Sequence, residues 1–207
     1  MTHDVIGVLA LQGGVAEHCH ILDELGVAHK KVRLPRDLDG ISGLILPGGE
    51  STTMSKLMVF NELEQPLREA LAGGLPAFGT CAGMILLADE VLNTRDDAVN
   101  LNAIDITVRR NAFGRQVDSF ETDLDFDGIE VGDGEDPVHA AFIRAPWVER
   151  VGPDVQVLST VPESAGPAAA GAVVAVRQGV AMATSFHPES TGETRVHEFF
   201  LRTLAGL

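Results

Sequence analysis

At residues 77–84 the chain reads Ala77-Phe78-Gly79-Thr80-Cys81-Ala82-Gly83-Met84, and the apolar character continues to residue 88. An apolar run that ends in Gly-x-Cys-x-Gly and enters a helix-compatible segment is typical of a nucleophile elbow, the sharp turn between a parallel strand and a helix. We expect glycines beside the cysteine because a strained turn leaves no room for a Cβ. The amino end of the helix would favour the reactive thiolate of Cys81. The alternative is a plain buried cysteine between strand and helix.

The composition is that of an ordinary globular chain with a strongly acidic balance. Of 207 residues, 45% are hydrophobic and 22% charged, and the formal net charge is −15. This length predicts a single domain over residues 1–207. The negative charge argues against nucleic acid or an anionic membrane as a partner. The chain has two cysteines, and we find no signal-peptide pattern and no bilayer-spanning apolar run, so we expect a cytoplasmic protein.

Strand and helix patterns alternate along the first part of the chain and give way to strands later. Aliphatic runs predict buried parallel strands at residues 5–11, 28–34, 43–46 and 75–78. Helices are expected at residues 15–25, 54–60, 62–72 and 192–204. Further strand patterns lie at residues 103–108, 117–124, 139–143, 155–160, 173–177 and 180–185. The sequence therefore predicts an α/β fold with a mostly parallel central sheet, flanking helices and an antiparallel extension.

A histidine and a carboxylate follow the last predicted strand, in Phe186-His187-Pro188-Glu189. In an extended backbone, residues two apart point the same way, so Glu189 could orient the His187 ring while the ring faces a thiol. Cys81, His187 and Glu189 then have the roles of nucleophile, base and orienting carboxylate. Taken alone, His187 would be an ordinary histidine at a strand end and Glu189 a solvated turn residue.

The loop Pro47-Gly48-Gly49-Glu50 supplies a further part of such a site. Backbone N–H groups in a glycine loop can form an oxyanion hole, which stabilises the negative oxygen of a tetrahedral intermediate. A plain tight turn between a strand and a helix is the alternative. With the cysteine and the histidine, the loop completes one mechanism of nucleophilic catalysis.

The Gly-Thr-Cys-Ala-Gly stretch at 79–83 and Phe-His-Pro-Glu at 186–189 together resemble the class I, or triad, glutamine amidotransferases. Longer stretches narrow the resemblance: Gly-Val-Leu-Ala-Leu-Gln-Gly at 7–13, Leu-Pro-Gly-Gly-Glu-Ser-Thr-Thr-Met at 46–54, Arg-Asn-Ala-Phe-Gly-Arg-Gln-Val-Asp-Ser-Phe-Glu at 110–121 and Phe-Ile-Arg-Ala-Pro at 142–146. Together they are similar to the glutaminase subunits of pyridoxal 5′-phosphate synthases, from about residue 6 to residue 200. The resemblance implies a flavodoxin-like fold.

The resemblance also implies the reaction and the residues that carry it. Cys81 would attack the side-chain amide of L-glutamine and form a glutamyl thioester, which His187 helps to hydrolyse. The implied oxyanion donors are backbone amides of Gly48, Gly49 and Ala82. The implied glutamine-binding residues are Gly49, Glu50, Ser51, Arg110, Ile143 and Arg144. An arginine suits the carboxylate of a free amino acid, whereas on sequence alone the two arginines would form surface salt bridges.

A partner is implied as well: a separate (β/α)8-barrel synthase subunit, in a hetero-oligomeric complex, that uses the ammonia to make pyridoxal 5′-phosphate (vitamin B6). No cofactor and no metal are expected in this chain. One alternative is a glutaminase that feeds another acceptor, such as imidazole glycerol phosphate synthase, and the stretch at 110–116 favours the first reading. A third hypothesis is a non-catalytic redox sensor in which Cys81 is an oxidisable thiol and His187 is dispensable.

Overall fold

The computed structural model describes residues 4–112, 119–132 and 136–207. Its strands are β1 (Ile6–Leu9), β2 (His29–Val32), β3 (Gly43–Leu46), β4 (Ala77–Thr80), β5 (Ala88–Leu92), β6 (Ile104–Arg109), β7 (Phe120–Leu124), β8 (Val138–Phe142), β9 (Trp147–Val151), β10 (Gln156–Thr160), β11 (Val173–Gln178) and β12 (Ala181–Thr184). The α-helices are α1 (Val15–Glu24), α2 (Ser51–Phe60), α3 (Glu64–Ala72), α4 (Ala82–Leu87), α5 (Pro188–Thr191) and α6 (Thr194–Phe199). A π-helical segment, Phe200–Ala205, continues α6.

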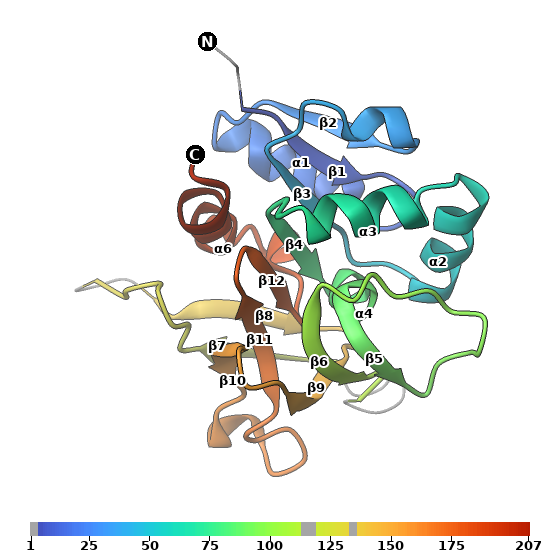
Figure 1. Cartoon of the computed structure of the whole chain (residues 1–207). Helices are drawn as coiled ribbons and strands as arrows, with labels where there is room; N and C mark the ends of the chain where they lie inside the picture. Colours follow the sequence, from blue (N-terminus) through green and yellow to red (C-terminus); the bar gives the residue numbers. More distant parts are fainter. Residues whose placement is uncertain (1–3, 113–118, 133–135) are drawn as a thin grey trace.

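The described strands form one large sheet and one small one (Figure 1). The large sheet has ten strands in the order β2-β1-β3-β4-β12-β11-β9-β6-β5, and β10 pairs with β11 outside this path. From β2 to β12 every neighbouring pair is parallel, and β11 then pairs antiparallel with β12, β9 and β10. The predicted parallel sheet with an antiparallel extension is confirmed. Strands β7 and β8 form a separate antiparallel pair.

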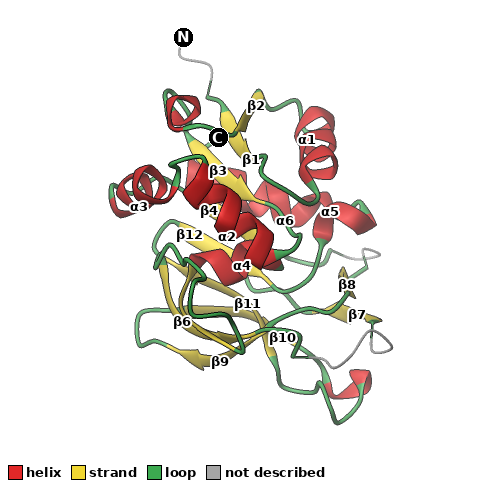
Figure 2. Ribbon diagram, turned by 90° about the vertical axis from the view of Figure 1, so that its right-hand side faces the viewer, coloured by secondary structure: helices red, strands yellow, loops and turns green. Residues whose placement is uncertain are grey.

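Helices cover both faces of the parallel strands (Figure 2). Ile6 and Val8 of β1 belong to one buried cluster, together with residues of α1 and α6. Leu9 belongs to a second cluster, which contains residues of α2, α3 and α4. Because side chains alternate along a strand, continuous aliphatic strands supply both cores at once. No helix in the described part of the chain combines the length and the apolar character that crossing a bilayer requires.

Several strands and helices differ from the prediction. Strands β5 and β9 were not predicted, because exposed charged side chains interrupt their apolar pattern: Asp89 and Glu90 in β5, and Glu149 and Arg150 in β9. The closing helix begins at residue 194 rather than 192, because Gly192 adopts a left-handed conformation that ends α5. The predicted strand at 117–124 begins at residue 120 within the described residues, and residues 113–118 of the quoted 110–121 stretch lie outside them.

Candidate active site

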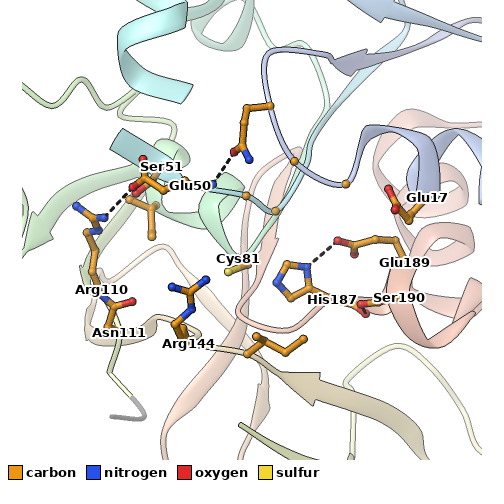
Figure 3. Close-up of a pocket in the computed structure, with 17 residues that line it drawn as sticks. Glu17, Glu50, Ser51, Cys81, Arg110, Asn111, Arg144, His187, Glu189 and Ser190 are labelled. Carbon is orange, nitrogen blue, oxygen red and sulfur yellow. Dashed lines mark hydrogen bonds and ion pairs between the residues drawn. The ribbon is translucent and has the colours of Figure 1, made fainter. Parts of the chain in front are cut away.

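The carboxyl ends of four adjacent parallel strands meet at one cavity (Figure 3). Strands β1, β3, β4 and β12 are followed there by residues 12–14, residues 48–51, Cys81 and residues 187–190. The cavity has a volume of about 520 Å³. In open α/β sheets, ligands bind at this edge because the loops after the strands converge there.

Cys81 occupies the sharp turn between β4 and α4. It has φ +48° and ψ −98°, which is strained for a residue with a side chain. A Cβ on Gly83 would lie 2.0 Å from the Leu46 carbonyl oxygen, and a Cβ on Gly79 would lie 2.6 Å from the Gly83 carbonyl carbon. The flanking glycines are therefore required by the packing of α4 onto β3 and β4. Because Gly79 and Gly83 have no side chains, α4 can pack closely and Cys81 can lie directly at the end of β4.

His187 and Glu189 lie beside Cys81 and are hydrogen-bonded to each other. The distance between His187 Nδ1 and Glu189 Oε1 is 2.8 Å, and the Glu189 side chain is only 2% exposed. The predicted contact is present, but the extended backbone expected for it is wrong. His187 is the N-cap of α5, and Glu189 lies in its first turn, because Pro188 favours the start of a helix.

The electrostatics of this group favour a protonated histidine. Burial acts to lower the pKa of His187, but its interactions with the Cys81 sulfur and the Glu189 carboxylate outweigh burial and raise the pKa to about 10. Burial acts to raise the pKa of Glu189, but the hydrogen bond from His187 outweighs burial and holds that pKa below its usual value. An imidazolium between a sulfur and a buried carboxylate can both stabilise a thiolate and deliver a proton.

The glycine loop is packed tightly against neighbouring groups. A Cβ on Gly48 would lie 2.1 Å from His187 Cε1, and one on Gly49 would lie 2.4 Å from Gln12 Oε1. The Gly48 N–H donates to Thr80 Oγ1 at 2.9 Å, and its carbonyl accepts from the Gly14 N–H at 3.0 Å. An oxyanion role for the Gly48 amide thus stays a prediction that requires its bond to Thr80 to be released.

Glu50 and Arg110 form one wall of the cavity. The Glu50 side chain caps α2 by accepting from the N–H groups of Thr52 and Thr53, at 3.1 and 2.7 Å. Burial acts to raise the pKa of Glu50, but hydrogen bonds from Thr53 and Thr52 dominate and lower it to about 2. Arg110 Nη2 lies 3.3 Å from Glu50 Oε1, and Nη1 donates to Thr52 Oγ1 at 3.2 Å. Arg110 is therefore held at the cavity rather than in a distant surface ion pair.

Ile143 and Arg144 complete the wall after β8. Ile143 is 50% exposed, and Arg144 has a positive φ of 49°. Figure 3 shows Arg110 and Arg144 on one side of Cys81, with His187 and Glu189 on the other. Two cationic groups at one end and a thiol at the other suit a ligand with a carboxylate and a reactive group at opposite ends.

The structure brings nearly all of the predicted site residues to this cavity. Those that line it are Gly48, Gly49, Glu50, Ser51, Cys81, Arg110, Ile143, Arg144, His187 and Glu189. Ala82 is buried at the start of α4, next to Cys81, and does not line the cavity. Seven lining residues were not predicted: Gln12, Gly13, Gly14, Glu17, Ile85, Asn111 and Ser190. Gln12, Gly13 and Asn111 fall in the stretches 7–13 and 110–121 that carry the family resemblance. That resemblance was the sequence signal that could have identified them as site residues.

The described residues contain no group of three or more histidine, cysteine or acidic side chains placed to hold a metal ion.

Comparison with solved structures gives the class of protein. A crystal structure described as a glutamine amidotransferase has a TM-score of 0.86 and 43% sequence identity, covering 98% of this chain and 99% of that chain. The fold is that of a glutamine amidotransferase. Within that class, the chain belongs to the SNO glutamine amidotransferase family, whose model matches residues 8–205.

Curated relatives of similar length agree with this assignment. Proteins named pyridoxal 5′-phosphate synthase subunit PdxT from Rhodococcus jostii strain RHA1 and Rhodococcus opacus strain B4 are 63% and 62% identical over 207 residues. In both cases the match covers 100% of this chain and 100% of the relative. The family resemblance predicted from the sequence is confirmed.

Proposed function

We propose that the chain is the glutaminase subunit of a pyridoxal 5′-phosphate synthase and hydrolyses L-glutamine to glutamate and ammonia through Cys81, His187 and Glu189. One observation carries the catalytic assignment: the His187 ring lies between Cys81 and Glu189 in the cavity, and its Nδ1 is 2.8 Å from Oε1 of the buried Glu189 carboxylate. The two relatives at 62–63% identity, both named as subunits of this synthase, support the biological assignment.

The reaction proceeds in two half-reactions. The Cys81 thiolate attacks the side-chain carbonyl carbon of glutamine, and the carbonyl electrons move onto the oxygen. When the oxyanion collapses, the C–N bond breaks, His187 gives its proton to the nitrogen, and ammonia leaves. A γ-glutamyl thioester remains on Cys81. His187 then takes a proton from water, the hydroxide attacks the thioester, and the thiolate leaves as glutamate forms.

Binding of glutamine follows from the charges of the opposite wall. Arg110 and Arg144 provide guanidinium groups for the α-carboxylate, and Glu50, next to Arg110, provides a negative charge for the α-ammonium group. Ser51 and Ile143 line the space between them. Backbone amides of Gly49 and Ala82, with that of Gly48 after rearrangement, stabilise the oxyanion.

The ammonia passes to a separate (β/α)8-barrel synthase subunit that makes pyridoxal 5′-phosphate, and residues 1–207 form the single glutaminase domain of the complex. The cytoplasm suits the protein, because both cysteines are free thiols and the mechanism needs one of them reduced. The acidic surface, with a net charge of −15, fits a protein partner rather than nucleic acid or a membrane.

Covalent labelling tests the catalytic assignment. A glutamine analogue with an electrophile in place of the amide is incubated with the protein and its synthase, and the cysteine-containing peptides are analysed by mass spectrometry. We expect label on Cys81, protection by glutamine, and strongly reduced labelling in His187→Asn. Cys19, the other cysteine, serves as an internal control. Label on Cys19 alone, or equal labelling of His187→Asn, would contradict the proposed nucleophile and base.

A further inference from the structure

Behind Glu189 lies a second group of buried polar side chains that the mechanism above does not use. His18 of α1, His197 of α6 and Thr80 of β4 are each 0% exposed. His18 Nδ1 is 2.8 Å from His197 Nε2, and His18 Nε2 is 3.2 Å from Thr80 Oγ1. Thr80 Oγ1 is 3.4 Å from Glu189 Oε1. A continuous chain of polar contacts therefore runs from α6 to the carboxylate that contacts His187.

The positions of the protons follow from the surroundings. His18 Nε2 lies 3.6 Å from Glu189 Oε1, and a ring nitrogen this close to a buried carboxylate is favourable when it carries a proton. Burial lowers the pKa of His18, so the ring is neutral and Nδ1 is an acceptor. It then accepts from His197 Nε2–H. Thr80 Oγ1 accepts from His18 Nε2–H and from the Gly48 N–H, and gives its own proton to Glu189.

His197 Nδ1 is left as a buried acceptor without a hydrogen bond of good geometry. The Glu193 carbonyl is close enough to favour a proton on this ring, but it does not meet hydrogen-bond geometry. Burial dominates and lowers the pKa of His197 to about 3.

We propose that Thr80 and His18 are positioning residues for catalysis, which hold the Glu189 carboxylate against His187 through this chain of hydrogen bonds. The proposal rests on the proposed function, because it assigns Glu189 its orienting role. Neither Thr80 nor His18 lines the cavity, so neither contacts glutamine directly. Phe78, two residues before Thr80 on β4, packs edge-on against the rings of His18 and His197 and fixes their planes.

Substitutions at Thr80 separate positioning from packing. Glutamine hydrolysis is measured with the synthase subunit present for Thr80→Ser, which keeps the hydroxyl, and Thr80→Ala, which removes it. We expect Thr80→Ser to retain most activity, and Thr80→Ala to lose about 10- to 100-fold in kcat with KM changed by less than about threefold. Thr107→Ala is the matched control, because Thr107 is a buried threonine of β6 that hydrogen-bonds Glu90, and its kcat should stay unchanged.

The pH profile gives a readout that a packing defect would not change. Four titratable groups face Glu189: His187, His18 and Glu17 from α1, and His197 from α6. Cys81 lies on the other side of the His187 ring. Removing a hydrogen bond to the carboxylate makes its ionised form less favourable, so the acid limb of kcat/KM should move to higher pH in Thr80→Ala, by about 0.5 to 1 pH unit. The same direction is expected in His18→Leu.

A double substitution tests whether Thr80 acts through Glu189. If it does, adding Thr80→Ala to Glu189→Gln should cause little further loss, because the carboxylate that Thr80 holds is already absent. The proposal would be overturned if the losses in kcat of the two single variants multiplied in the double variant. It would also be overturned if Thr80→Ala had the kcat and pH profile of Thr80→Ser. If Thr80→Ala does not fold, His18→Gln and His18→Leu test the proposal instead. The side-chain amide of glutamine can place a donor where His18 Nε2–H lies, so His18→Gln should keep more activity than His18→Leu. Full activity of Glu189→Gln alone would instead refute the proposed function.

Discussion

Glu50 Oε1 lies 3.3 Å from Arg110 Nη2, so the acid that caps α2 also holds the arginine at the cavity wall. One carboxylate thereby links the amino end of α2 to a cation that directly follows β6, the strand next to the edge strand β5. This arrangement presents Arg110 to the carboxylate of glutamine in a restricted conformation, which reduces the side-chain entropy lost on binding.

The first prediction concerns Arg110. Arg110→Gln should raise the KM for glutamine by about 10- to 100-fold with a smaller effect on kcat, because a charged hydrogen bond to the substrate is lost. Arg109→Gln is the matched control, since Arg109 pairs with Glu149 away from the cavity. Steady-state ammonia release with the synthase present measures both constants. Equal KM values for the two variants would contradict the assignment.

The second prediction concerns Glu50 and acid. Its pKa in the folded chain, about 2, lies below the ordinary value of 4.5. The ionised carboxylate therefore stabilises the fold fully above about pH 4.5, and this contribution is lost as the pH falls towards 2. The wild type should exceed Glu50→Gln in free energy of unfolding at pH 6, by a small amount because the Glu50 side chain is half exposed, and the difference should shrink at pH 3. Urea unfolding at several pH values measures it.

A control for that experiment is Glu62→Gln, which removes one negative charge just beyond the other end of α2. A difference between wild type and Glu50→Gln that stays constant, or grows, from pH 6 to pH 3 would show that Glu50 does not act as an ionised cap.

The third prediction concerns the basic limb of activity. The pKa of His187 is raised to about 10, so its proton is favoured by the fold up to that pH and lost as the pH rises through it. The kcat/KM for glutamine should therefore fall only near pH 10, and in Glu189→Gln the fall should move to lower pH because one hydrogen bond that raises the pKa is absent. A basic limb that is the same in both proteins would argue against the His187–Glu189 pair.

The fourth prediction concerns the synthase and the Gly48 loop. Because the Gly48 amide is engaged by Thr80, we expect weak ammonia release by the isolated chain and an increase of about 10-fold or more on adding the synthase. Gly48→Ala should fold but lose activity with the synthase present, because its Cβ would displace the His187 ring. Equal turnover of the wild type with and without the synthase would contradict the proposed rearrangement.

The sequence predicted the parallel half of the sheet well, because buried aliphatic strands such as β1 and β3 have an uninterrupted apolar pattern. It failed at β5 and β9, where pairing with neighbouring strands, and not local pattern, stabilises segments that carry exposed charges. Short-range patterns do not contain that information.

The predicted site shows the same division. Cys81, His187 and the glycine loop are local motifs, and they are found at the same cavity. His18 carries no local signal, since its importance depends on α1 and α6 packing on one face of β4. Long-range contacts of this kind become visible only when the helices are placed.

The most direct test of the account is ammonia release from glutamine by the wild type, Cys81→Ala and Cys19→Ala, each with and without the synthase subunit. The account predicts activity in the wild type and in Cys19→Ala that increases with the synthase, and none in Cys81→Ala under either condition. Activity that survives the loss of Cys81, or that is absent from all three proteins, would contradict the proposed glutaminase mechanism.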